Sequence, residues 1–168
     1  MTEKFAICAG SFDPPTLGHL WVFERGSQLF DKLIIAVGTN PEKKYTFSLY
    51  DRKKLLEKTT EHLPNVEIDE FPDTFLTDYA KSKDAAFILR GIRNESNYLY
   101  EREMRYTNSD FAPEITTVFL IPPRELAQVS SSFVKNLVGP RHWQNKIERY
   151  VPQAVYLALM AGFHGYDD

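Results

Sequence analysis

Two apolar segments limit the folds that are open to this chain. Residues 32–38 and 85–89 are apolar at nearly every position, so a strand formed by either one would have both faces buried. Strands of that kind occur in parallel sheets, whose faces are covered by helices. Strand-like and helix-like segments alternate along the rest of the chain. This alternation predicts an α/β fold with one doubly wound, mostly parallel five-stranded sheet and helices on both faces.

Hydrophobic periodicity and capping residues give the expected elements. Ser48 and Asp51 resemble a helix-capping box with Asp in place of the usual Glu. With 168 residues and no repeat or linker, the chain 1–168 is expected to form a single domain. We expect strands at residues 5–9, 32–38, 66–69, 85–89 and 116–121. We expect helices at residues 17–30, 48–62, 75–82, 96–109, from 130 onward and at 152–163.

The composition argues against two classes of partner. Its 20 Lys and Arg residues and 23 Asp and Glu residues give a net charge of -3, whereas nucleic-acid binders are usually basic. No apolar run approaches the length that spans a membrane. The one cysteine, Cys8, lies in the first expected strand and is interpreted as a buried structural thiol. We therefore expect a cytoplasmic protein that binds neither nucleic acid nor a membrane.

A turn rich in glycine and proline follows the first expected strand. Residues 9–20 lead from that strand into a helix, which is where open α/β sheets bind their ligands. Gly10 and Gly18 allow the backbone to approach an anion, and the helix N-terminus offers free N–H groups. His19, in the first helical turn, can add an imidazole to the same space. A purely structural role for His19 is the alternative, and the surrounding glycines favour the anion site.

Three further polar segments are expected at the same edge of the sheet, because the strands that precede them are parallel. Lys43 follows the second strand, residues 90–93 follow the fourth, and residues 130–132 follow the fifth. A guanidinium directly after a buried strand can bind a phosphate through two hydrogen bonds. The serine run can bind phosphate at a helix start, although a plain helix cap is the other interpretation. A solvated side chain is the alternative for Lys43.

The motifs at these positions resemble a known family. Residues 10–14 (GSFDP) and 16–19 (TLGH) are similar to the nucleotidyltransferase signature. Residues 90–93 (RGIR) and 129–135 (VSSSFVK) are similar to later motifs of one branch, the bacterial phosphopantetheine adenylyltransferases. The resemblance extends over most of the chain, from the first expected strand to the last helix.

This resemblance implies a Rossmann-like fold and an enzyme that transfers AMP from ATP to 4'-phosphopantetheine. The products would be dephospho-coenzyme A and pyrophosphate, and Mg²⁺ would be the cofactor. The acceptor phosphate would attack the α-phosphorus of ATP in line, without a covalent enzyme intermediate. The family also implies a homo-oligomer, a hexamer.

The resemblance assigns roles to particular residues. His19 is expected to stabilise the transition state, with Lys43 and Arg93 as further catalytic residues. The residues expected to bind ATP are Ser11, Phe12, His19, Gly91, Ile92, Arg93, Glu101, Leu126, Ala127, Gln128, Val129, Ser130, Ser131 and Ser132. The residues expected to bind the acceptor are Ser11, Lys43, Leu76, Arg90 and Asn108. No metal ligand follows from the resemblance.

Two other functions fit the same motifs. A related nucleotidyltransferase would use another acceptor phosphate, such as nicotinamide mononucleotide or glycerol phosphate. Residues 90–93 disfavour the glycerol-phosphate branch. A nucleotide-binding module without catalytic activity is the second alternative, and turnover with each acceptor distinguishes all of these.

Overall fold

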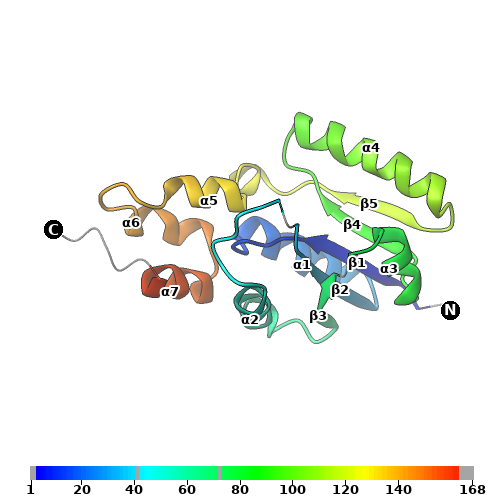
Figure 1. The fold of residues 1–168 in the computed structure, drawn as a ribbon, viewed down its shortest axis with the longest axis horizontal. Coiled ribbons are helices and arrows are strands. Elements are labelled where there is room, and N and C mark those ends of the chain that lie inside the picture. The colour runs from blue at the N-terminus through cyan, green and yellow to red at the C-terminus, as the bar shows by residue number, and fades with distance from the viewer. Residues whose placement is uncertain (1–2, 41, 72, 163–168) are drawn as a thin grey trace.

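A five-stranded sheet lies at the centre of the computed structural model, which describes residues 3–40, 42–71 and 73–162 (Figure 1). The strand order is β3-β2-β1-β4-β5, and every neighbouring pair is parallel. The chain builds outward from β1 to β3 and then returns to build outward on the other side. Ligands bind at the switch point of such sheets, which here lies between β1 and β4. The strands are β1 (Phe5–Gly10), β2 (Lys32–Gly38), β3 (Val66–Phe71), β4 (Phe87–Gly91) and β5 (Thr116–Leu120).

Helices cover both faces of this sheet, because the side chains of each central strand alternate between the faces. On one face, Cys8, Ile35 and Leu89 pack with residues of α1 and α2. On the other face, Ile7 and Ile88 pack with residues of α3 and the C-cap of α4. The doubly wound α/β fold is therefore confirmed, and its strands are all parallel. The helices are α1 (Leu17–Leu29), α2 (Leu49–Thr60), α3 (Leu76–Ser82), α4 (Glu95–Phe111), α5 (Ser131–Leu137), α6 (Gln144–Ile147) and α7 (Gln153–Gly162), with 3-10 helices η1 (Arg124–Leu126) and η2 (Glu148–Tyr150).

A third apolar cluster lies beyond the sheet, where α5, α6 and α7 gather beside α2 (Figure 1). Val134, Ile147 and Leu159 are buried there together with Leu55 of α2. The helix α6 and both 3-10 helices were not predicted, because elements of three or four residues are too short to show a period. The predicted last residue of the final helix, Phe163, lies outside the described residues. None of the described helices is long and apolar enough to cross a membrane.

Four of the five strands differ from the expected bounds by one or two residues, and the differences at β3 and β4 have a clear structural reason. The apolar pattern predicts a strand from residue 85, but β4 begins at Phe87. The backbone N–H of Ala85 donates to the Ala80 carbonyl oxygen at 2.9 Å, so Ala85 completes the turn that ends α3. The strand β3 continues past residue 69 to Phe71, because it pairs with β2 as far as Gly38.

Candidate active site

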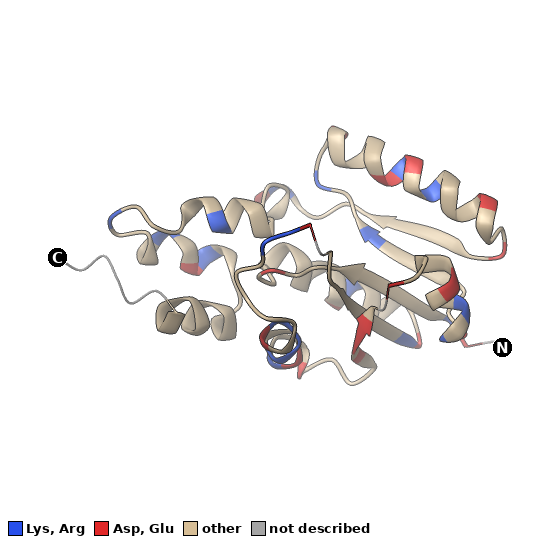
Figure 2. Ribbon diagram, in the orientation of Figure 1, with Lys and Arg blue, Asp and Glu red and all other residues tan. Residues whose placement is uncertain are grey.

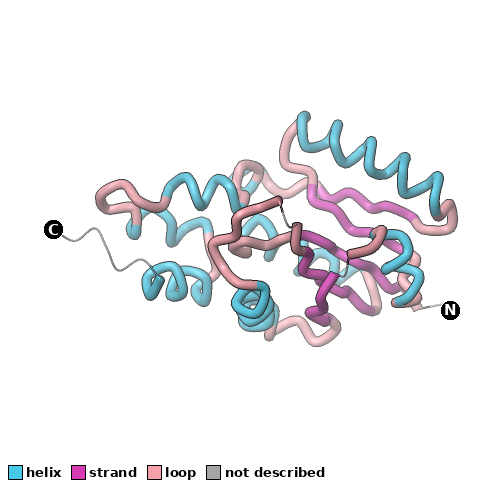
Figure 3. The backbone as a smooth tube through the Cα atoms, in the orientation of Figure 1, coloured by secondary structure: helices cyan, strands magenta, loops and turns pink. Residues whose placement is uncertain are grey.

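The loops that follow β1, β2, β4 and β5 leave the sheet at one edge, as parallel strands require (Figure 3). Figure 2 shows basic residues on the loop between β2 and α2 and on the segment between β4 and α4. Lys43 and Arg93 belong to these segments, and Arg90 is the penultimate residue of β4. Basic residues therefore follow both neighbours of β1 in the sheet and flank the turn that joins β1 to α1.

The first turn of α1 fixes the imidazole of His19. Thr16 caps the helix, and its hydroxyl oxygen accepts a hydrogen bond from the His19 backbone N–H at 3.3 Å. In return, Nδ1 of His19 accepts a hydrogen bond from the Thr16 backbone N–H at 3.1 Å. Because this bond uses the lone pair of Nδ1, a neutral imidazole carries its proton on Nε2.

The surroundings of His19 keep the imidazole neutral. Burial, followed by the positive charges of Arg93 and Arg90, lowers the pKa of His19 from 6.5 to about 3. The rings of Phe12 and Phe23 lie beside the imidazole, at centroid distances of 5.2 and 6.3 Å. At neutral pH, His19 therefore presents one N–H donor, at Nε2, which suits it to bind a phosphoryl oxygen.

The carboxylate of Asp13 ties three parts of the site together. Asp13 is 2% exposed, and its two oxygens accept hydrogen bonds from the backbone N–H groups of Thr46 and Phe47, both at 2.9 Å. The ammonium of Lys135 on α5 lies 3.2 Å from the same carboxylate. The loop that contains Lys43 is thereby fastened to the β1–α1 turn. Asp13 belongs to the motif at residues 10–14, but the sequence did not predict this role for it.

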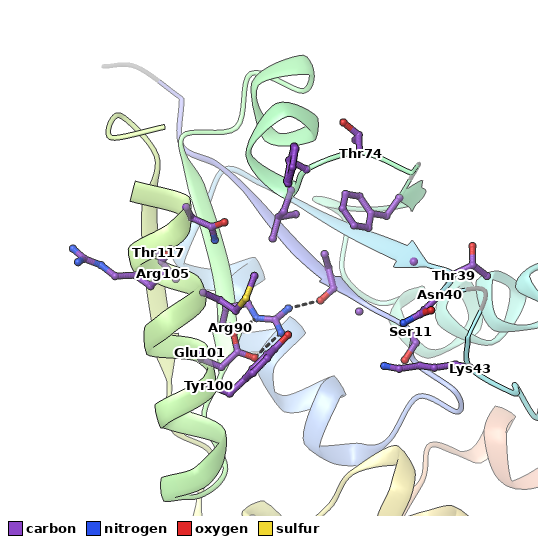
Figure 4. A pocket seen from close by; sticks show the side chains of 18 of the residues that line it. Ser11, Thr39, Asn40, Lys43, Thr74, Arg90, Tyr100, Glu101, Arg105 and Thr117 are labelled. Carbon is purple, nitrogen blue, oxygen red and sulfur yellow. Dashed lines mark hydrogen bonds and ion pairs between the residues drawn. The ribbon is translucent and has the colours of Figure 1, made fainter. Parts of the chain in front are cut away.

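A cavity of about 430 Å³ opens at the carboxyl ends of the strands, between the β2–α2 loop and α4 (Figure 4). Its wall includes every residue that the sequence analysis expected to bind the acceptor. In Figure 4, Lys43 and Ser11 lie on one side of the cavity, and Arg90 and Glu101 lie across from them. These walls are lined by Ser11, Lys43, Leu76, Arg90 and Asn108, and the apolar side chains of Phe71, Phe75 and Met104 continue them.

Arg90 and Glu101 form a buried ion pair on the wall of this cavity. Glu101 is 5% exposed, and both of its oxygens are bonded to Arg90, to Nε at 2.8 Å and to Nη2 at 2.6 Å. Nη1 of Arg90 donates to the Ala9 carbonyl oxygen. Burial acts to lower the pKa of Arg90, but the hydrogen bonds of Glu101 outweigh it and raise this pKa above the ordinary value. Three of the five guanidinium N–H groups are engaged in these bonds, which leaves two for a ligand.

Most residues expected to bind ATP form a second group, on the α1 side of the switch point. A Cβ added to Gly18 would lie 2.6 Å from the Val129 carbonyl oxygen, so α1 begins in direct contact with that segment. The hydroxyl of Ser131 donates to the Pro14 carbonyl oxygen at 2.8 Å. Ser11 and Glu101 are the expected ATP residues that line the cavity itself. The others lie outside the cavity wall: Phe12, His19, Gly91, Ile92, Arg93 and residues 126–132.

Comparison with known proteins gives the class of this protein first. The model of the cytidylyltransferase-like family matches residues 7–137, which places the chain among the nucleotidyltransferases. Curated relatives narrow the class. The phosphopantetheine adenylyltransferases of Neisseria meningitidis serogroup C and Chromobacterium violaceum are 55% and 51% identical over 160 and 158 residues. These alignments cover 95% and 94% of this chain and 94% and 96% of the relatives. The chain belongs to the phosphopantetheine adenylyltransferase family.

A solved structure shares the fold at much lower identity. It is a nicotinic acid mononucleotide adenylyltransferase of Plasmodium falciparum, complexed with APC. The TM-score is 0.71, with 14% identity, over 99% of this chain and 98% of that one. The likeness confirms the Rossmann-like architecture that the sequence motifs imply.

Proposed function

We propose that this protein transfers the AMP group of ATP to the phosphate of 4'-phosphopantetheine and releases dephospho-coenzyme A and pyrophosphate. The observation that carries the proposal is the cavity at the switch point. Its polar wall contains Ser11, Lys43 and Arg90, and its apolar wall contains Phe71 and Leu76. An acceptor with a phosphate and a long, weakly polar arm fits a cavity with these two kinds of wall.

The reaction needs no general base from the protein. The acceptor phosphate is largely dianionic at neutral pH, since its second pKa is about 6. One of its oxygens forms the new bond to the α-phosphorus of ATP, and the bond from that phosphorus to the bridging oxygen breaks as pyrophosphate leaves. The task of the protein is to hold both phosphates in line and to stabilise the charge that develops between them.

We assign three groups to that task. Nε2–H of His19 donates to an oxygen of the α-phosphate, because Nδ1 is already occupied by the Thr16 N–H. Lys43 and the two uncommitted N–H groups of Arg90 hold the acceptor phosphate from opposite sides of the cavity. Arg93 neutralises the phosphates of ATP, and its charge already acts on His19. The second group of residues, on the α1 side, would bind the rest of ATP, mainly through backbone atoms where Val129 is buried.

Mg²⁺ would enter as the complex with ATP and not as a centre built by the chain. The described residues contain no group of three or more His, Cys, Asp or Glu side chains that could hold a metal. Glu101 is the acidic residue on the cavity wall, and both of its oxygens are bonded to Arg90. Magnesium commonly binds through substrate phosphates and keeps several waters, and when bound it would neutralise phosphate charge.

We also propose that the protein is a homo-oligomer, with the hexamer of its family as the expected form. Tyr98, Leu99 and Tyr106, which the helical period brings to one side of α4, are between 43% and 49% exposed. Apolar side chains gathered on one surface mark interaction sites. Light scattering after size exclusion should give six chains of 19.5 kDa each, and elution as a monomer would contradict this proposal.

The function is tested by supplying ATP and Mg²⁺ with one acceptor at a time and measuring pyrophosphate. Phosphopantetheine should support turnover, and nicotinamide mononucleotide should not. Pyrophosphate release with nicotinamide mononucleotide alone would identify a related nucleotidyltransferase. Nucleotide binding without release with either acceptor would indicate a binding module.

A further inference from the structure

Arg52 is a buried cation that the proposed chemistry does not use. It lies on α2 and is 0% exposed. No acidic side chain among the described residues forms an ion pair with it, and its Nε is buried without a hydrogen-bond partner. An arginine buried in this way carries a large desolvation cost. The contacts of the Arg52 side chain indicate which part of the structure it holds in place.

The contacts of the Arg52 guanidinium lead to the wall of the cavity. Nη1 donates to the carbonyl oxygens of Ser11, at 2.7 Å, and Gly38, at 2.9 Å. These residues follow or end the neighbouring strands β1 and β2, and both line the cavity. The guanidinium also lies over the ring of Tyr45, 4.2 Å from its centroid, and Tyr45 lines the cavity as well. One side chain thus joins two strand ends and a loop behind the phosphate end of the cavity.

The contact with Tyr45 continues to Lys43. The hydroxyl oxygen of Tyr45 accepts a hydrogen bond from the Asn40 backbone N–H at 2.6 Å. The Asn40 carbonyl oxygen in turn accepts a hydrogen bond from the Lys43 backbone N–H at 3.0 Å. Arg52 therefore holds Asn40 and Lys43 of the loop through its contact with Tyr45. Asp13 holds the part that follows, at residues 46–47.

We propose that Arg52 is a positioning residue for the acceptor phosphate. It fixes the backbone of Ser11 on one side and, through Tyr45 and Asn40, the loop that presents Lys43. Its positive charge behind this wall also attracts a phosphate dianion. The proposal deepens the proposed function, because it concerns the same acceptor site. Arg52 touches no ligand, and its effect is exerted through Ser11 and Lys43.

The test compares Arg52→Met and Arg52→Lys with Lys58→Met, which removes one positive charge from an exposed position on the same helix. Arg52→Met should lower kcat/KM for phosphopantetheine about 100-fold, the scale of a small misplacement of reacting groups. Arg52→Lys retains the charge and should fall between Arg52→Met and the wild type, whereas Lys58→Met should match the wild type. ATP affinity, titrated without acceptor, should change by less than about threefold in all of them.

A double-mutant cycle separates positioning from general loss of structure. If Arg52 acts through Lys43, adding Arg52→Met to Lys43→Met should cost at least about fivefold less than it costs the wild type. Fully additive losses, or parallel losses of turnover, ATP affinity and thermal stability, would overturn the proposal. Wild-type kcat/KM in Arg52→Met would overturn it as well.

Tyr45→Phe tests the same connection should the Arg52 variants fold poorly. It removes the hydroxyl that Asn40 bonds and keeps the ring beneath the guanidinium, on a side chain that is only partly buried. It should lower kcat/KM for the acceptor about fivefold, and an unchanged value would overturn the connection through the loop. All variants are compared with whichever acceptor the wild type uses, so absence of turnover with phosphopantetheine counts against the proposed function alone.

Discussion

The tautomer of His19 leads to a prediction in which one substitution lowers mainly activity and another lowers mainly stability. Nδ1 accepts from the Thr16 N–H, and Nε2–H is the group assigned to the transition state. A glutamine places its amide donor near the Nε2 position but leaves the Thr16 N–H without this acceptor. An asparagine can place its oxygen near Nδ1, where it serves the Thr16 N–H, but its side chain does not reach the Nε2 position.

The expected magnitudes follow from these two hydrogen bonds. Removing one preorganised donor from a transition state lowers kcat by about 10²–10³-fold, or about 3–4 kcal/mol of barrier. His19→Asn should show this full loss, whereas His19→Gln should stay within about tenfold of the wild type. Loss of a cap hydrogen bond costs about 1 kcal/mol of unfolding free energy. His19→Gln should show this destabilisation, and His19→Asn should show little of it.

Two measurements on the same protein preparations test the expected effects of the two His19 substitutions. Pyrophosphate release at saturating ATP and acceptor gives kcat, and urea unfolding gives the free energy of unfolding. The reasoning would be refuted if His19→Asn were the more active variant, or if both variants lost activity and stability to the same extent. An isothermal titration with ATP should give near wild-type affinity for both, because the donor acts mainly as charge develops in the reaction.

The same residue makes stability depend on pH. The pKa of His19 is about 3 in the folded protein and 6.5 in an unfolded chain, so the unfolded state binds the extra proton between these values. The stabilising contribution is complete above pH 6.5 and is lost as the pH falls toward 3. Between pH 6.5 and 5, the wild type should lose up to about 2 kcal/mol of unfolding free energy relative to His19→Asn. A difference that stays constant over this range would contradict the lowered pKa.

Two further predictions concern contacts within the site. Gly18→Ala should weaken ATP binding about tenfold or more and lower thermal stability, because its Cβ would meet a backbone carbonyl at 2.6 Å. The matched control is Gly162→Ala, whose Cβ meets nothing within 4 Å. Equal behaviour of the two variants would contradict the close approach at Gly18. Glu101→Gln should destabilise the fold by about 3 kcal/mol and raise KM for the acceptor, because it leaves the buried charge of Arg90 poorly compensated. Glu103→Gln, on the exposed side of α4, should do neither, and a Glu101→Gln protein with wild-type stability would argue against the ion pair.

The architecture could be predicted from the sequence because the central strands are buried on both faces. A strand that is apolar on both faces is stable in a parallel sheet whose two faces are covered by helices. The structure has such a sheet. The first residue of β4 could not be predicted in the same way. Ala85 is as apolar as the strand that follows, and its backbone bond to Ala80 depends on how α3 ends, which periodicity does not encode.

The site was predictable where residues follow strand ends and not where distant side chains meet. The residues expected to bind the acceptor line one cavity, where Ser11, Lys43 and Arg90 meet because parallel strands bring their carboxyl ends together. By contrast, an arginine within the polar pattern of α2 is expected to be solvated, yet Arg52 is buried beneath two strand ends. Asp13 likewise meets partners 33, 34 and 122 positions away, a relation that no local pattern contains.

Transfer of the AMP group itself is the most direct test of the proposed function. ATP labelled at the α-phosphate is incubated with the protein, Mg²⁺ and phosphopantetheine, and the labelled products are separated. The label should appear in dephospho-coenzyme A in equal amount to the pyrophosphate released. Label that remains in ATP, or appears as free AMP, would contradict the account.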